Sequence, residues 1–156
     1  MQKISDEIIH FFRSLSFTVV STIDKVGRPH NSCKGIVEIK PEGKVYLLDL
    51  YKLVTYENLK RNPAISITGI NENSFQGYCL KGKATIIQAS ALSQEIIKAW
   101  EDKITSRITQ RVIKNIVGEK GHSSHPEALL PKPAYLILVE VEEIVNLTPQ
   151  HLVGGT

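Results

Sequence analysis

Cysteine, long apolar runs and excess charge of either sign are all scarce in this sequence. Its two cysteines, Cys33 and Cys79, form no CxxC pair and lie among strand-like residues, which is typical of reduced thiols in a cytoplasmic protein. No segment is apolar over a length that could span a bilayer, and residues 1–16 carry charges throughout their apolar pattern, unlike a signal peptide. We therefore expect a soluble cytoplasmic protein without a membrane partner.

The net charge of +3 is spread along 156 residues, and no run of basic residues interleaves with aromatic ones. This pattern argues against nucleic acid as a ligand and slightly favours anionic small molecules. A chain of this length is most simply one domain, here residues 1–156. It can bury a real core and still share a site with a second subunit.

The hydrophobic period changes from helical to strand-like early in the chain. Apolar residues recur at helical spacing behind Ser5, which can cap a helix, and predict a short amphipathic helix over residues 5–15. Beyond it, β-rich segments separated by turns predict six strands. The expected strands are Phe17–Asp24, His30–Lys40, Lys44–Leu50, Ala64–Ile70, Phe75–Ile87 and Tyr135–Ile144.

Two glycines and a later apolar stripe indicate how the strands are arranged. Gly77 and Gly82 interrupt the fifth strand and suggest bulges or sharp bending, as closing a small barrel would require. A long helix is predicted between Ser93 and Gly118, with one apolar face against the sheet. That face consists of Ile97, Trp100, Ile104, Ile108 and Ile116. The sequence therefore predicts a mainly β fold, a six-stranded antiparallel barrel with a short N-terminal helix and one long helix.

Residues 53–67 join a short helix to a strand. Pro63 cannot continue a helix and disfavours helical backbone at Asn62, so the helix should end there. The helix also follows a strand. Its start, with Lys52 and Thr55, is therefore suited to hold an anion through backbone N–H groups and side chains.

A second polar segment, residues 29–35, carries amide, hydroxyl and ammonium groups close together on a predicted strand. Because side chains alternate along a strand, Ser32 and Lys34 share one face. Asn31 and Cys33 share the other. Lys34 either contacts a ligand or is a sheet-surface lysine, and this segment alone leaves both interpretations open.

A predicted loop near the C-terminus contains His122 and His125 with Glu127. They could bind a metal or a haem, but the loop has no cysteine ligand and no helix to fix its geometry. Ordinary loop histidines are the simpler interpretation, so we assign no metal ligand.

A cationic stripe follows the predicted long helix at spacings of four, four and three residues. It is either a solvated helix face or a surface that attracts an anionic substrate or a nicotinamide phosphate. Its members are Lys103, Arg107, Arg111 and Lys114.

Three runs of the sequence carry a recognisable pattern, FTVVSTIDKVGRPHNSCKG, KVYLLDLYKLVTYENLKRNPAISI and GYCLKGKATI. They cover most of residues 17–87. In them an Asn-Leu-x-x-Asn-Pro helix end lies between two strands, preceded by a Gly-x-Pro-His turn. With these runs the chain resembles the pyridoxamine 5′-phosphate oxidase-like family of flavin-binding split β-barrels.

The resemblance implies a homodimer with two FMN molecules at the subunit interface. In that family the strand matching residues 31–34 lies along the flavin, and the strand end matching residues 49–52 continues the pocket. The positions matching Val54 and Thr55 hold the phosphate. The resemblance therefore assigns to cofactor binding Asn31, Ser32, Cys33, Lys34, Asp49, Leu50, Tyr51, Lys52, Thr55 and Asn58. Asn58 either braces the turn at the pocket or simply hydrogen-bonds the short helix.

The sequence departs from the family pattern at two places. Relatives usually carry Lys or Arg at or just before the position of Thr55, where this chain has none, and Lys34 and Lys52 could supply the charge. Members that oxidise pyridoxamine phosphate also carry substrate-binding Arg and His near the C-terminus. The ending LTPQHLVGGT offers only His151, so the resemblance does not imply that activity.

The leading hypothesis is a small FMN-dependent oxidoreductase or electron carrier, with a nicotinamide nucleotide or another electron donor as partner. No catalytic residue is assigned, because a bound flavin carries the chemistry itself. One alternative is a binding module of the same fold for flavin, haem or deazaflavin. Another is an interaction protein that has lost its ligand.

Overall fold

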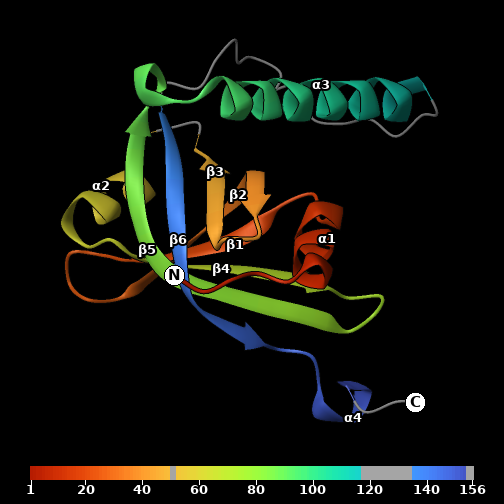
Figure 1. Cartoon of the computed structure of the whole chain (residues 1–156), viewed down its shortest axis with the longest axis horizontal. Helices are drawn as coiled ribbons and strands as arrows, with labels where there is room; N and C mark the ends of the chain where they lie inside the picture. Colours follow the sequence, from red (N-terminus) through yellow and green to blue (C-terminus); the bar gives the residue numbers. More distant parts are fainter. Residues whose placement is uncertain (50–51, 117–134, 154–156) are drawn as a thin grey trace.

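The computed structural model describes residues 1–49, 52–116 and 135–153, with the backbone alone for residues 107–116. A short helix and three strands are followed by a second helix, two strands, a 3-10 turn, a long helix, a last strand and a short helical turn (Figure 1). The helices are α1 (Asp6–Ser14), α2 (Val54–Arg61), η1 (Ala89–Ala91, a 3-10 turn), α3 (Gln94–Ile116) and α4 (Gln150–Val153). The strands are β1 (Thr18–Ile23), β2 (Pro29–Lys40), β3 (Lys44–Leu48), β4 (Ala64–Asn71), β5 (Gln76–Gln88) and β6 (Tyr135–Asn146).

The six strands form one closed antiparallel barrel in the order β1-β2-β3-β6-β5-β4. β6 lies between β3 and β5 and pairs with both of them. β1 pairs with β4, which completes the ring. The predicted mainly β fold and six-stranded antiparallel barrel are confirmed, whereas η1 and α4 have no counterpart among the predicted elements.

A β-bulge bends the long strand β5 where β6 crosses it. The register of β5 against β6 shifts between Lys81 and Gly82. A Cβ atom on Gly82 would collide with the carbonyl oxygen of Glu140, so only glycine fits there. The predicted bulge is confirmed at Gly82 but not at Gly77. Gly77 pairs in regular register with Ile70 in the β4–β5 hairpin.

Helices α1 and α2 lie on opposite sides of the barrel (Figure 1). On α1, Phe11 and Phe12 are buried, and the ring of Phe11 packs edge-on against Tyr78 of β5 with centroids 5.1 Å apart. Helix α2 ends at Asn62, whose backbone is extended as Pro63 requires. The predicted start of α1 and the predicted end of α2 are both confirmed. Each depends on a local feature, a capping side chain for α1 and a proline for α2.

Helix α3 packs against the outer face of β2, β3 and β6 and forms a second apolar cluster there. Ser93 caps the helix through a hydrogen bond that its hydroxyl accepts from the N–H of Ile96, as predicted. The buried face differs from the prediction by one residue, because Ile96 is buried and Ile97 only half-buried. The cluster consists of Val37, Leu48, Ile96, Trp100, Ile104 and Leu136. The side chains of Ile108 and Ile116 lie outside the described residues. None of the helices in the described part of the chain has the length and hydrophobicity of a membrane span.

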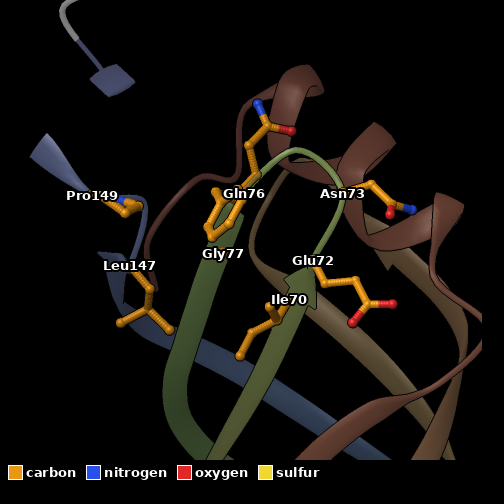
Figure 2. Close-up of a pocket in the computed structure, with 8 residues that line it drawn as sticks. Ile70, Glu72, Asn73, Gln76, Gly77, Leu147 and Pro149 are labelled. Atoms are coloured by element: carbon orange, nitrogen blue, oxygen red, sulfur yellow. The ribbon is translucent and has the colours of Figure 1, made fainter. Parts of the chain in front are cut away.

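The outer face of β1 and β4 carries exposed apolar side chains. Val19 and Ile70 point outward from β1 and β4, and Ile70 is 65% exposed. At the end of the β4–β5 hairpin, Ile70 borders a hollow of about 560 Å³ that reaches the segment after β6 (Figure 2). The hollow is lined by Ile70, Glu72, Asn73, Phe75, Gln76, Gly77, Leu147 and Pro149.

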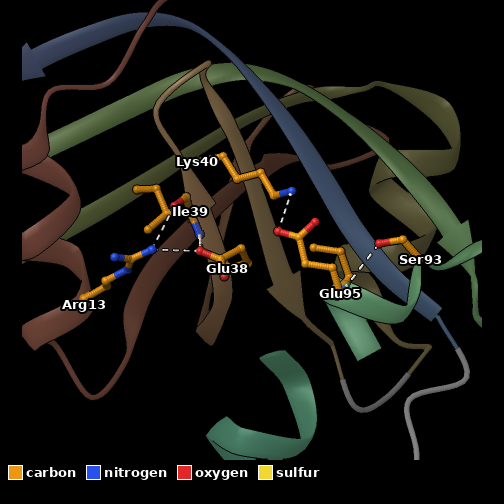
Figure 3. A network of polar contacts seen from close by, with 7 residues as sticks. Arg13, Glu38, Ile39, Lys40, Ser93 and Glu95 are labelled. Atoms are coloured by element: carbon orange, nitrogen blue, oxygen red, sulfur yellow. Dashed lines mark hydrogen bonds and ion pairs between the residues drawn. The ribbon is translucent and has the colours of Figure 1, made fainter. Parts of the chain in front are cut away.

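Ion pairs fasten α1 and α3 to the same strand, β2 (Figure 3). Arg13 of α1 contacts the carboxylate of Glu38 at 2.9 Å. Two residues along, Lys40 contacts Glu95 of α3 at 3.1 Å, which raises the pKa of Lys40 through a hydrogen bond and the opposite charge. Both pairs are partly exposed, so each contributes little to stability and mainly fixes where the helices lie.

Candidate functional site

Polar side chains are buried where α2 meets the inside of the barrel. Two of them are on β1, one directly follows β3 and two are on α2. A buried polar group is costly unless it is hydrogen-bonded, and here each has a partner in the same region. The five residues are Thr18, Thr22, Asp49, Thr55 and Asn58.

The start of α2 brings two hydroxyl groups together. Ser32 Oγ of β2 lies 3.1 Å from Thr55 Oγ1, and either oxygen could be the donor. Leu53 occupies the N-cap position and gives the helix no side-chain cap, so the first backbone N–H groups of α2 lack that partner. Hydroxyls beside an uncapped helix start are suited to bind an anion.

A buried ion pair lies next along β2. Lys34 Nζ donates to Asp49 Oδ1 at 2.6 Å, and the two side chains are only 8% and 5% exposed. Tyr135, the first residue of β6, donates its hydroxyl to Asp49 Oδ2 at 2.6 Å. Burial, followed by the hydrogen bond and the charge of Asp49, raises the pKa of Tyr135 well above its usual range. The tyrosine therefore stays protonated and continues to donate at physiological pH.

Lys52 lies just ahead of α2, over two aromatic rings. Its Nζ is 5.4 Å from the ring centroid of Tyr56 and 5.6 Å from that of Tyr135. The two rings pack edge-on with centroids 5.1 Å apart. Lys52 is exposed, unlike Lys34, so its ammonium group is accessible to a ligand at the helix start.

Asn58 ties α2 to the barrel. Its amide nitrogen donates to Thr22 Oγ1 at 3.0 Å, and its Oδ1 accepts from Arg61 at 2.7 Å. Both ends of the side chain are thus engaged within the subunit. This agrees with the interpretation in which Asn58 holds the short helix.

The predicted alternation along β2 is confirmed. Ser32 and Lys34 point to the inside with Thr55 and Asp49, whereas Asn31 and Cys33 are exposed on the outer face. Asn31 Oδ1 accepts a hydrogen bond from Ser21 of β1 at 2.5 Å, and Cys33 is a free thiol. The barrel therefore brings together Ser32, Lys34, Asp49, Lys52, Thr55 and Asn58, and separates Asn31 and Cys33 from them. Leu50 and Tyr51 lie outside the described residues.

The other predicted candidates fall mostly beyond what the structure describes. His122, His125 and Glu127 lie outside the described residues. Residues 1–49, 52–116 and 135–153 contain no group of His, Cys, Asp and Glu side chains arranged for a metal ion, as far as their side chains are described. The four cationic residues of the stripe all fall on α3. The side chains of Arg107, Arg111 and Lys114 are outside the described part.

Sequence reasoning missed Thr18 and Thr22 of this site and, most importantly, Tyr135. It is separated from Asp49 by 86 positions, and the pattern around it predicts only a buried strand. A weak signal exists, since a tyrosine begins a strand whose next four residues are aliphatic, and a buried phenol needs a hydrogen-bond partner.

Comparison with known proteins agrees with this architecture. The sequence profile of the pyridoxamine 5′-phosphate oxidase family matches residues 4–131. The chain belongs to this family. No curated protein matches it in sequence.

Solved structures with the same fold share little sequence with this family member. HupZ of Group A Streptococcus is 17% identical with a TM-score of 0.64, and the match covers 93% of this chain and 94% of HupZ. A Lactobacillus delbrueckii protein assigned as a pyridoxamine 5′-phosphate oxidase is 16% identical with a TM-score of 0.62, over 93% and 95% of the two chains. An F420 reductase is 13% identical with a TM-score of 0.57, over 91% and 98%. At these identities the likeness shows the fold.

Proposed function

We propose that this chain binds FMN as a homodimer and acts as a small oxidoreductase or electron carrier. The observation that carries the proposal is the contact between Ser32 and Thr55 at 3.1 Å, beside the uncapped start of α2. A phosphate dianion prefers hydroxyls, backbone N–H groups and a nearby cation, and this corner of the barrel offers all three.

Lys52 supplies the cation that relatives carry at or just before the position of Thr55. The charge of Lys34 is balanced by Asp49 within the subunit, whereas Lys52 is exposed ahead of the helix. Lys34 also lies close to the site, because it is the neighbour of Ser32 on the same face of β2. Bound FMN would supply the electron or hydride transfer, so the protein needs only to hold and orient it.

A second subunit fits the exposed outer face. Asn31 and Cys33 on β2 and Val19 on β1 lie there, and Val19 pairs with Cys33 on one side and with Thr68 of β4, two residues before Ile70, on the other. Exposed apolar patches on soluble proteins mark interaction sites, and a site shared by two subunits would use Asn31 and Cys33 for the part of the flavin between them.

One observation favours a second candidate, a module that binds its ligand without turnover. The pair of Lys34 and Asp49 is neutral, so the positive charge offered at the helix start depends on Lys52. A ligand whose anionic group lies elsewhere, among flavins, deazaflavins or haem, would tolerate this. Anaerobic mixing of the flavin-loaded protein with NADH and NADPH distinguishes a reductase from a carrier or binding module, because only a reductase is bleached at a rate useful for turnover.

The first experiment is the visible spectrum of the purified protein and titration with FMN. Replacing Lys52 and Thr55 together by alanine should raise the FMN dissociation constant at least about tenfold, because each hydrogen bond to a charged group contributes about 1.5–3 kcal/mol. Lys60→Ala is the matched control, since Lys60 also lies over the ring of Tyr56, at 5.5 Å, but on the last turn of α2. It should leave FMN affinity unchanged.

A colourless protein that takes up no added FMN would contradict the flavin proposal. Equal FMN affinity in the double variant and in wild type would instead mean that the phosphate binds elsewhere.

A further inference from the structure

We infer that Tyr135 is a positioning residue of the proposed phosphate site, where it holds Lys52 through its ring and the neighbouring Lys34–Asp49 pair through its hydroxyl. The inference rests on the proposed FMN function and adds a residue from a distant strand to it. Tyr135 is 1% exposed. Its hydroxyl contacts Asp49, and its ring contacts Lys52.

The hydroxyl fixes the carboxylate of Asp49. Tyr135 donates to Oδ2 and Lys34 donates to Oδ1, both at 2.6 Å, so each oxygen of Asp49 has its own donor. A carboxylate held at both oxygens cannot rotate, and Lys34 therefore keeps one position on the inner face of β2. The raised pKa of Tyr135 means that this donor is present at any pH at which the protein would work.

The ring fixes Lys52. An exposed lysine has many rotamers, and binding a phosphate requires that most of them be lost. Contact of the ammonium group with the rings of Tyr135 and Tyr56 restricts Lys52 before any ligand arrives. Edge-on packing of the two rings, at an interplanar angle of 67°, holds that surface in place.

Stability alone gives little reason for this arrangement. A buried ion pair is often no more stable than well-packed apolar residues of the same size, and the residues that follow Tyr135 on β6, Leu136 and Ile137, are apolar. A tyrosine hydroxyl and an ion pair are nevertheless kept together beside the start of α2. Positioning of charge toward a ligand accounts for both.

The test compares FMN with riboflavin, which lacks the phosphate, on the whole chain. Tyr135→Phe keeps the ring under Lys52 and removes the bond to Asp49, and Tyr135→Leu removes both. We expect FMN affinity to fall about three- to tenfold in the first variant and further in the second. Riboflavin affinity should change less than about twofold in either. Tyr46→Phe, a half-buried tyrosine under α3, serves as the control and should leave both affinities unchanged.

Each outcome has a separate meaning. An equal loss of FMN and riboflavin affinity in Tyr135→Phe would show a merely structural role and overturn the inference while the FMN proposal stands. Wild-type protein that binds FMN no more tightly than riboflavin would overturn the phosphate site itself. If Tyr135→Leu does not fold, the ratio of the two affinities in Tyr135→Phe decides alone.

Discussion

At the residue scale, Tyr135 makes the free energy of unfolding depend on pH, because its hydroxyl ionises at a higher pH in the folded protein than in the unfolded chain. Burial and Asp49 raise its pKa, so the folded state keeps the proton after the unfolded chain has lost it at about pH 10. The stabilising contribution is therefore fully present below about pH 10 and is lost as pH rises above it.

This gives a prediction for the Tyr135→Phe variant. At neutral pH it should be less stable by about 1–3 kcal/mol, because one oxygen of Asp49 loses its donor. Above about pH 10 the wild-type free energy of unfolding should fall more steeply, by up to about 1.4 kcal/mol per pH unit, so the two curves converge. Denaturant unfolding across this range measures both. Tyr78, whose pKa is also raised, is present in both proteins, and parallel curves would contradict the assignment.

The site residues that could be predicted are those whose chemistry is local. Period-two alternation placed Ser32 and Lys34 on one face, and the Asn-Pro helix end located Thr55 at a helix start. The pairing of Lys34 with Asp49 and Tyr135 was not predictable, because it needs three strands brought together by barrel closure. A pattern in one segment carries no information on which distant side chain faces it.

At the element scale, the bend in β5 depends on one glycine. The bulge beside Gly82 lets β6 cross so closely that an added methyl group would meet the backbone of Glu140. Backbone cannot move aside as a flexible side chain can, so strand pairing would have to shift.

Gly82→Ala should therefore destabilise the protein by about 3 kcal/mol or more. Gly27→Ala is the comparison, since Gly27 has a positive φ of 83° but nothing within 4 Å of an added Cβ, and strain alone should cost about 1 kcal/mol. Denaturant unfolding of the two variants checks the difference. Equal losses would mean that β5 and β6 separate at this point without cost.

Element boundaries were predictable where capping residues and proline act locally, as at Ser5, Ser93 and Pro63. The buried face of α3 was predicted one residue away, at Ile97 in place of Ile96. Both isoleucines fit a helical stripe with Trp100. Contact with the sheet selects between them, and a helical pattern alone does not reveal that contact.

At the scale of the whole molecule, the proposed homodimer should depend on the outer face of β4. Ile70→Asp adds a charge beside the hollow at a position that is 65% exposed, so the fold should tolerate it. Val26→Asp is the matched control, since Val26 is also 65% exposed but lies in the β1–β2 turn. Sedimentation velocity should show dimers for wild type and Val26→Asp and mainly monomers for Ile70→Asp, because a charge buried without a partner is costly. Unchanged dimerisation of Ile70→Asp would place the interface elsewhere.

The position of β6 between β3 and β5 has a consequence for biosynthesis. A ribosome synthesises β1 to β5 first. Until residue 146 has emerged, β3 and β5 are unpaired edges of the nascent sheet, and they carry side chains that the complete barrel buries, such as Leu47 and Leu80. Unpaired edges attract strands from other chains. Before β6 pairs with both edges, the incomplete barrel would therefore be most prone to misassembly and most accessible to chaperones.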